Sequence, residues 1–192
     1  MSYQTYTTEA IVCGTFNRNT ADRSYLLFTK EAGMLYADAR SAREERSRQR
    51  MSLQDFSYVR VSLVKGKSSW KVGSIEPRGN FFMEAGDKAA RGSVVSLTKF
   101  LRRFYGSEEA LPDLFEYFLS SLRIVKGEVV SRTVLEHIVM VKLLHELGYV
   151  DERVLPQIAH ESVAALAAQV IDDDIEAELA PLIEKAVSLS HL

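Results

Sequence analysis

The hydrophobic period changes once along this chain, and that change limits the folds it can adopt. Up to about residue 79, apolar residues alternate with polar ones or form short β-branched runs, as in half-buried strands. Beyond a transition at 79–92, apolar residues recur at helical spacing. We therefore expect two domains, a β domain over residues 1–79 and a helical domain over residues 80–192.

Five strands are expected in the first domain. They are predicted at 8–16, 23–29, 34–39, 53–66 and 70–77. The KGKS segment at 65–68 resembles a hairpin turn, and Pro77 is expected to end the fifth strand. Five short strands with no helical pattern between them favour the small, partly open barrel of the OB-fold, a common nucleic-acid binder.

The second domain is expected to be all helical. Apolar stripes predict helices at 94–104, 111–125, 133–147, 163–171 and 175–189. Thr133 and Glu136 have the spacing of a capping box, and Gly148 stands where a helix would stop. Pro181 predicts a break or kink near Ala180 in the last helix.

Composition excludes several classes of protein. With 46% hydrophobic and 26% charged residues, the chain has the make-up of a packed globular protein. No stretch approaches the roughly 20 apolar residues of a membrane span, and the N-terminal residues lack the pattern of a secretion signal. Cys13 is the single cysteine, so an internal disulfide is excluded. We expect a cytoplasmic protein with no membrane association.

The charge is distributed unevenly between the two halves. Residues 1–80 hold 13 lysines and arginines against 8 acids, whereas the remainder holds 11 against 18. A basic first half and an acidic second half favour two domains with different partners. Uneven scatter of solvated charge is an equally good explanation, because neither excess is extreme.

Arginines are concentrated between residues 40 and 50. The planar guanidinium fork donates two parallel hydrogen bonds, which suits phosphate, so this loop predicts salt-sensitive, sequence-independent contact with a nucleic-acid backbone. A solvated loop or helix, neutralised by Glu44 and Glu45, is the alternative. The candidates are Arg40, Arg43, Arg46, Arg48 and Arg50, and the basic face is expected to extend over Lys65, Lys67 and Lys71.

Aromatic side chains on the barrel are further candidates, because bases stack on aromatic rings. Barrel packing is the alternative for each of Tyr25, Tyr36, Tyr58 and Trp70. No catalytic constellation is visible. The four histidines have no adjacent nucleophile or carboxylate at a recognisable spacing, and no glycine-rich phosphate loop occurs. We therefore predict a protein that is not an enzyme and that uses no metal or cofactor.

Several short motifs occur in an order that resembles the N-terminal OB domain of the RecO family. They are TEAIV at 8–12, ADRSYLLFTKEAG at 21–33, ADARSAR at 37–43, SR at 47–48 and LQDF at 53–56, with KLLHELGY at 142–149 similar to a helix end of that family. The resemblance covers about residues 5 to 150. It departs at Ser41, where the family often has glycine, and at Asp55, where proline is usual. Some members carry a four-cysteine zinc site, which a single cysteine cannot form, so the resemblance implies a divergent or short member.

The resemblance implies a non-enzymatic recombination mediator. Such a protein is expected to bind single- and double-stranded DNA without sequence specificity, to promote strand annealing and to help load recombinase in DNA repair. RecR and the acidic, apolar-ended tail of single-stranded-DNA-binding protein are the implied partners.

A groove for that tail needs a basic rim, and the candidates are Lys99, Arg102, Arg103 and Arg132, with ordinary solvated residues as the alternative. A protein-interaction adaptor that has kept the fold but lost DNA binding is the rival interpretation. Its support is Glu44, Glu45 and the acidic second half.

Overall fold

The computed structural model describes residues 5–20, 22–40, 48–66 and 69–190. The chain falls into two compact units. The first comprises Met1–Glu84 with Gly106–Phe115, and the second comprises Ala85–Tyr105 with Glu116–Leu192. In the part of the chain that the structure describes, no helix is both long and apolar enough to cross a membrane.

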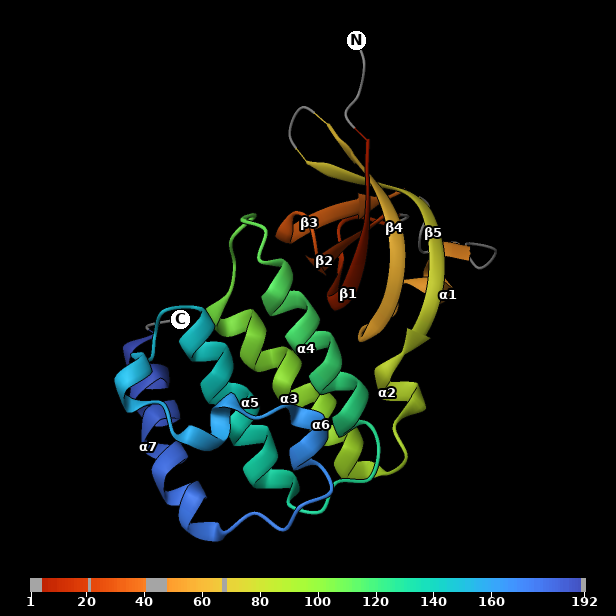
Figure 1. The fold of residues 1–192 in the computed structure, drawn as a ribbon. Coiled ribbons are helices and arrows are strands. Elements are labelled where there is room, and N and C mark those ends of the chain that lie inside the picture. Colours follow the sequence, from red (N-terminus) through yellow and green to blue (C-terminus); the bar gives the residue numbers. More distant parts are fainter. Residues whose placement is uncertain (1–4, 21, 41–47, 67–68, 191–192) are drawn as a thin grey trace. The chain divides into compact units, whose positions relative to one another are not determined.

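The first unit is built on a closed five-stranded barrel (Figure 1). Its strands are β1 (Thr5–Asn17), β2 (Arg23–Thr29), β3 (Gly33–Ala39), β4 (Ser57–Lys65) and β5 (Trp70–Asn80). They follow the order β1-β2-β3-β5-β4, and β4 also pairs with β1, which closes the ring. The β3–β5 pairing is parallel and short, whereas the other pairings are antiparallel. The expected OB-fold is confirmed.

Alternate residues of each strand fill the barrel, as the period of two requires. The interior is formed by Ala10, Val12, Tyr25, Leu27, Leu35, Ala37, Ala39, Leu53, Val59, Val61, Leu63 and Trp70. The pairing register of β1 shifts between Val12 and Gly14. Because such a bulge adds one residue to a strand, it reverses which residues beyond it face inward, and Phe16 comes to the outer surface.

The segment between β3 and β4 differs from the prediction of strands without a helix. A short helix, α1 (Arg48–Ser52), lies inside the arginine-rich run. Leu53 belongs to a turn and not to a strand, although its side chain is fully buried in the barrel core. The turn closes where the Ser57 N–H donates to the Gln54 carbonyl at 3.0 Å, and β4 begins there.

The prediction that Pro77 ends the fifth strand is wrong, because β5 continues to Asn80. Proline donates no hydrogen bond, so it is tolerated at a sheet edge or a bulge. Both conditions hold here. β3 pairs with β5 only at Trp70 and Lys71, and the register with β4 shifts between Tyr58 and Val59, beside the Val59–Pro77 pair.

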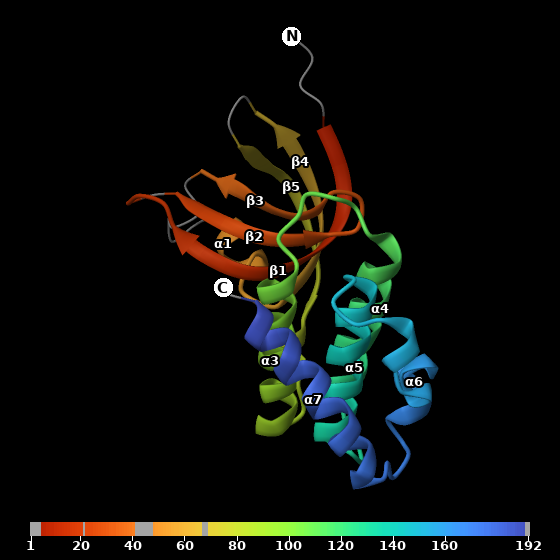
Figure 2. The ribbon, with the colours of Figure 1, turned by 90° about the vertical axis from the view of Figure 1, so that its left-hand side faces the viewer.

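Helices make up the second unit and the connections to it. They are α2 (Phe81–Glu84), α3 (Lys88–Phe104), α4 (Pro112–Val125), α5 (Arg132–Glu146), α6 (Val163–Leu166) and α7 (Asp173–Leu189), with short 3-10 turns η1 (Glu152–Val154) and η2 (Gln157–His160). α5 packs against both α3 and α7 (Figure 2). Gly148 follows the end of α5 with a φ of 79°, which is the left-handed conformation expected at a helix stop.

Three details of the helical prediction are corrected. The capping box at Thr133 does not form, because α5 begins earlier, at Arg132, and the Glu136 carboxylate instead accepts a hydrogen bond from Ser93 Oγ at 2.6 Å. The helix predicted at 163–171 ends at Leu166. Beyond it, Val170 is 86% exposed, and the N–H of the buried Ile171 donates to Ser131 Oγ at 2.9 Å instead of to a helical carbonyl.

The break predicted at Pro181 is also absent, and α7 runs through it. Proline removes the hydrogen bond to the carbonyl four residues earlier, here that of Ala177. Both Pro181 and Ala177 are exposed, so water can satisfy that carbonyl. Leu179 and Ala186 are buried on either side of the proline and keep the helix packed.

Candidate nucleic-acid interface

Strand register aligns four side-chain positions in one row on the outside of the barrel. Phe16 pairs with Ser24, Ser24 pairs with Asp38, and Asp38 pairs with Lys71. The neighbouring residues of β2 and β3 fill the core, so this row faces outward. Tyr36 lies two residues before Asp38 in β3 and therefore shares its face.

The aromatic part of this face is a pair of exposed rings. Phe16 is 38% exposed and Tyr36 is 55% exposed, with ring centroids 5.7 Å apart and planes inclined by 58°. Leu26 lies opposite Tyr36 on β2 and is buried. Exposed rings held on paired strands offer a rigid surface on which a flat ligand such as a nucleobase can stack.

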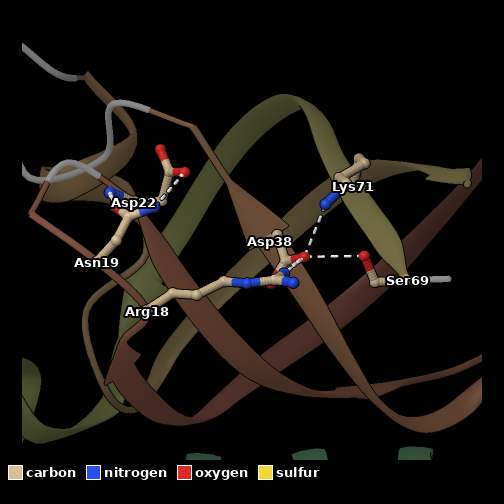
Figure 3. A network of polar contacts seen from close by, with 6 residues as sticks. All are labelled: Arg18, Asn19, Asp22, Asp38, Ser69 and Lys71. Atoms are coloured by element: carbon tan, nitrogen blue, oxygen red, sulfur yellow. Dashed lines mark hydrogen bonds and ion pairs between the residues drawn. The ribbon is translucent and has the colours of Figure 1, made fainter.

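Asp38 is the centre of a polar network next to the rings (Figure 3). Its side chain is only 7% exposed, and its Oδ2 atom accepts from Lys71 Nζ at 2.7 Å and from Ser69 Oγ at 2.9 Å. Arg18 forms an ion pair with the same oxygen. Because a buried carboxylate is stable only when paired, Asp38 fixes both cationic side chains on this face.

The turn that carries Arg18 has its own hydrogen bonds. The Arg18 N–H donates to the Asp22 carbonyl at 3.2 Å. Asn19 and Asp22 exchange two further bonds, at 2.9 Å from Asn19 Nδ2 and at 2.6 Å from the Asp22 N–H (Figure 3). The β1–β2 connection is therefore a built turn that holds Arg18 in place.

The cations are close enough to affect one another. Burial lowers the pKa of the Lys71 amine, and the positive charges of Arg18 and Arg40 lower it further. Lys65 ends β4 directly opposite Trp70, with its Nζ atom 5.1 Å from the centre of that ring. We call Arg18, Arg40 and Lys71 the basic cluster; Lys65 pairs with Trp70, so it lies on the opposite side of the sheet from Lys71 and is not part of the cluster.

The structure brings together only part of the predicted basic set. Arg40 is exposed directly after β3, and Lys65 is exposed at the end of β4. Arg50 is exposed on α1, with no recorded contact to the cluster, and Arg48 opens that helix. Arg43, Arg46 and Lys67 lie outside the described residues. Arg18 was not predicted, although its position one residue after the first strand was an available signal.

The four aromatic side chains predicted to stack on bases differ in how deeply they are buried. Tyr25 and Trp70 belong to the barrel core. Tyr58 is partly buried and donates a hydrogen bond to the Glu9 carboxylate. Tyr36 alone of the four is exposed, and its partner Phe16 was missed because the bulge in β1 reverses its direction.

Two of the four basic residues predicted for the helical unit are engaged inside it. Arg103 donates from Nε to Ser190 Oγ at 2.8 Å and from Nη2 to the Val187 carbonyl at 2.9 Å, at the end of α7. Arg132 donates to the Val125 and Gly127 carbonyls at 2.7 and 2.6 Å, at the end of α4. The other two, Lys99 and Arg102, are exposed on α3.

A groove of about 630 Å³ lies elsewhere in this unit, between α4, α5 and the segment 159–164. Apolar parts of Tyr117, Ile124 and Val163 line it, and both basic side chains, Arg123 and Lys142, and acidic ones, Glu116 and Glu161, reach it. Lys142 also forms an ion pair with Glu146 at 3.0 Å. Burial raises the pKa of the Tyr117 hydroxyl, so this side chain stays neutral at physiological pH. Sequence reasoning missed the groove because its walls come from segments distant in the chain.

No metal-binding constellation occurs among the residues whose positions the structure describes. Groups of three or more histidine, cysteine, aspartate or glutamate side chains with suitable placement are absent there. Cys13 is buried in β1, where its thiol donates a hydrogen bond to the Ile11 carbonyl at 3.6 Å.

The strand order, the parallel contact of β3 with β5 and the short helix between β3 and β4 define the class, an OB-fold domain joined to a helical unit. Within that class, residues 1–81 match the family described as "Recombination protein O N terminal". Residues 1–81 are therefore similar to the N-terminal domain of the RecO family, a match that covers less than half of the chain.

Relatives named DNA repair protein RecO support this assignment. Identity is 30% over 144 residues with the protein of Desulfitobacterium hafniense, covering 75% of this chain and 52% of the relative. It is 28% over 150 residues with that of Heliobacterium modesticaldum, covering 77% and 53%. For Clostridium novyi it is 25% over 146 residues, covering 75% and 56%. The chain spans about half the length of the curated relatives it matches.

Proposed function

We propose that this chain binds single- and double-stranded DNA without sequence specificity through the outer face of its barrel. In this proposal it acts in the cytoplasm as a non-enzymatic recombination mediator that promotes strand annealing and recombinase loading in DNA repair. The observation that carries the proposal is the placement of the Phe16–Tyr36 ring pair beside the basic cluster on one face of an OB barrel. The names of the relatives support the repair role.

The two parts of the face have different tasks. Cationic groups along the barrel neutralise phosphates and release counterions, a contribution that single strands and duplexes share. Exposed rings stack only on bases that are unpaired or unstacked, so they favour single strands. Neither interaction reads base identity, which supports binding without sequence preference.

The remaining arginines of the loop are proposed to extend this surface. Arg43, Arg46 and Arg48 follow Arg40 closely in sequence, and Arg40 belongs to the basic cluster. Replacing all three with alanine is expected to weaken DNA binding and flatten its salt dependence. Unchanged affinity in that triple variant would remove the loop from the binding surface.

A double variant of two exposed cations of the barrel, Arg40 of the basic cluster and Lys65 at the end of β4, tests the proposed binding surface. Arg40→Ala with Lys65→Ala removes two cations that are not bound to Asp38. The slope of log affinity against log salt for a single strand should become shallower by ~1.4, from about 0.7 per lost phosphate contact. Lys88→Ala with Lys185→Ala, two exposed lysines of the helical unit, is the matched control. An equal change in both pairs would show that only net charge matters.

Partner binding is proposed for the helical unit. The groove beside α4 combines an apolar floor with Arg123 and Lys142, which suits an acidic segment with an apolar end, such as the tail of single-stranded-DNA-binding protein. RecR is proposed as a second partner. A labelled peptide with an acidic run and an apolar end should bind the chain, and Arg123→Ala should weaken it. Peptide binding without DNA binding at low salt would favour the adaptor interpretation.

A further inference from the structure

A second hollow in the barrel unit lies away from the Phe16–Tyr36 rings. It has a volume of about 310 Å³ and is formed where β2 begins, at the turn before β4, and around α2. The residues that line it include Arg23, Gln54, Asp55, Phe56, Phe82 and Met83. We call it the turn pocket.

One wall of the turn pocket is aromatic. The rings of Phe56 and Phe82 stack with centroids 5.6 Å apart and planes inclined by only 23°. Met83 beside them is 68% exposed. The outer face of this ring stack and the polarisable thioether beside it form an apolar wall that suits a planar ligand.

The backbone at Phe56 is held in an unusual conformation. Its φ of 68° lies in the left-handed region, which a bulky side chain rarely adopts. Two hydrogen bonds maintain it, from the Phe56 N–H to the Val12 carbonyl at 2.8 Å and from the Phe81 N–H to the Phe56 carbonyl at 3.1 Å. Backbone strain that the surrounding structure maintains is concentrated at functional sites. Here the strained conformation of Phe56 holds its ring at the pocket.

The polar groups of the pocket are available for a ligand. Arg23 Nε is buried and has no well-aligned hydrogen-bond partner among the described residues. Burial raises the pKa of the Tyr25 hydroxyl, whereas the charge of Arg23 and a hydrogen bond from its side chain lower it and the charge of Asp55 raises it, so the three groups lie near one another. Asp55 is exposed, and its carboxylate has no recorded partner in the described ranges.

We propose that the turn pocket binds an unpaired guanine base. A carboxylate only accepts hydrogen bonds, and guanine is the one DNA base with two adjacent N–H donors, N1 and N2, on its pairing edge. Adenine and cytosine place an acceptor beside their donor, and thymine has a single donor between two acceptors. The O6 and N7 atoms of guanine accept from arginine, here Arg23. The base plane would lie against the Phe56–Phe82 wall.

Guanine could come from a single strand or from a free nucleotide, because both present the same edge. The first source rests on the proposed DNA binding, whereas the second does not. The 192-residue chain should therefore be titrated with guanosine, adenosine and cytidine 5′-monophosphates by two-dimensional NMR. All three nucleotides carry the same phosphate, so differences in their affinities report on the base. Guanosine monophosphate is expected to bind at least about tenfold more tightly than the other two.

Asp55→Asn should remove this preference, because an amide presents a donor to the N–H groups of guanine. The affinities for the other two nucleotides should stay the same. Asp113→Asn, at an exposed aspartate in α4, is the charge-matched control and should keep the preference. Phe82→Leu should weaken guanine binding through loss of the flat wall. Unchanged thermal midpoints would show that each variant is folded.

Equal affinity for the three nucleotides, or a preference that survives Asp55→Asn, would overturn the proposal. Binding of a thymine-only oligonucleotide tests the proposed function independently of the turn pocket, since it depends on the barrel face alone. Placing one guanine in that strand identifies the source. If the strand with one guanine binds more tightly and Asp55→Asn abolishes the gain, the pocket binds guanine in single-stranded DNA. If only the free guanine nucleotide is preferred, the pocket binds nucleotides.

Discussion

At the scale of single residues, Asp38 sets the balance of charge on the proposed DNA-binding face. It lies beneath the surface and shares one carboxylate oxygen among Lys71, Ser69 and Arg18. The same negative charge that orders the two cations also opposes an approaching phosphate. Asp38 is therefore expected to stabilise the local structure and, at the same time, to lower the affinity for DNA.

Asp38→Asn should strengthen DNA binding while it weakens the fold. Affinity at low salt is expected to rise by about fivefold, equivalent to ~1 kcal/mol, because two cations lose their counter-charge. The free energy of unfolding should fall by no more than about 1 kcal/mol, since Arg18 and Lys71 are 51% and 40% exposed and water screens their ion pairs. Anisotropy titration and thermal unfolding measure the two effects. Weaker DNA binding would show instead that Asp38 is required to position these cations.

Removing the ring pair should weaken the binding of single strands more than the binding of duplexes. Phe16→Ala with Tyr36→Ala is expected to cost about 1–3 kcal/mol per stacked base in single-strand binding and little in duplex binding. Stability should fall less than on removal of a core ring, because Phe16 and Tyr36 are 38% and 55% exposed. Tyr149→Ala, at a tyrosine that is 49% exposed in the helical unit, is the control. An equal loss for both forms of DNA would contradict a stacking role.

Asp151 gives a prediction about pH. Hydrogen bonds from the Arg153 side chain, and then from its backbone N–H, lower the pKa of the Asp151 carboxyl to about 2. Because the pKa is lower in the folded state than in the unfolded state, its stabilising contribution is present above the unfolded value and is lost as pH falls toward 2. NMR titration of the carboxyl carbon should show this midpoint, and Arg153→Ala should raise it. A midpoint near 4 in the parent chain would mean that the contact does not persist in solution.

Sequence could identify which residue types bind phosphate, but it could not show which side chains face outward. Phe16 is an example. Continuing the alternation from Ala10 and Val12 places it inside the barrel, and only the register shift after Val12 brings it out. Tyr25 and Tyr36 look alike in sequence, yet one is core and the other is surface, because they fall on opposite faces of paired strands.

At the scale of elements, long periodic segments were predictable and their ends were not. β2 was predicted with its exact bounds, and the main helices were located by their apolar stripes. The short helix α1 was missed because the charges of the arginine-rich run conceal one turn of helix. Gln49 and Leu53 are four residues apart in that segment, and the buried Leu53 side chain anchors it to the barrel.

The uninterrupted course of α7 leads to a prediction about stability. Packing of Leu179 and Ala186 holds the helix together although Pro181 lacks an N–H. Pro181→Ala should restore the bond to the Ala177 carbonyl and raise the free energy of unfolding by about 1–3 kcal/mol. Chemical denaturation measures this change. A loss of stability would show that proline contributes more by restricting the unfolded chain than it costs in the helix.

At the scale of the whole molecule, charge and chemistry divide between the two units. The barrel unit carries the ring pair, the basic cluster and the turn pocket, whereas the helical unit carries the groove with Arg123 and Lys142. The overall order of a barrel followed by helices was predictable because the two hydrophobic periods differ. The groove was not, since segments 116–124 and 159–164 meet only in the folded chain.

Binding of DNA by the chain itself is the central claim, and one measurement tests it directly. Labelled single-stranded and duplex oligonucleotides of two unrelated sequences with the same number of guanines are titrated with the 192-residue chain by fluorescence anisotropy, from about 50 to about 200 mM salt. We expect binding to both forms, a steep loss of affinity with salt and little difference between the sequences. No binding to either form at the lowest salt would contradict the account and favour a protein-interaction adaptor.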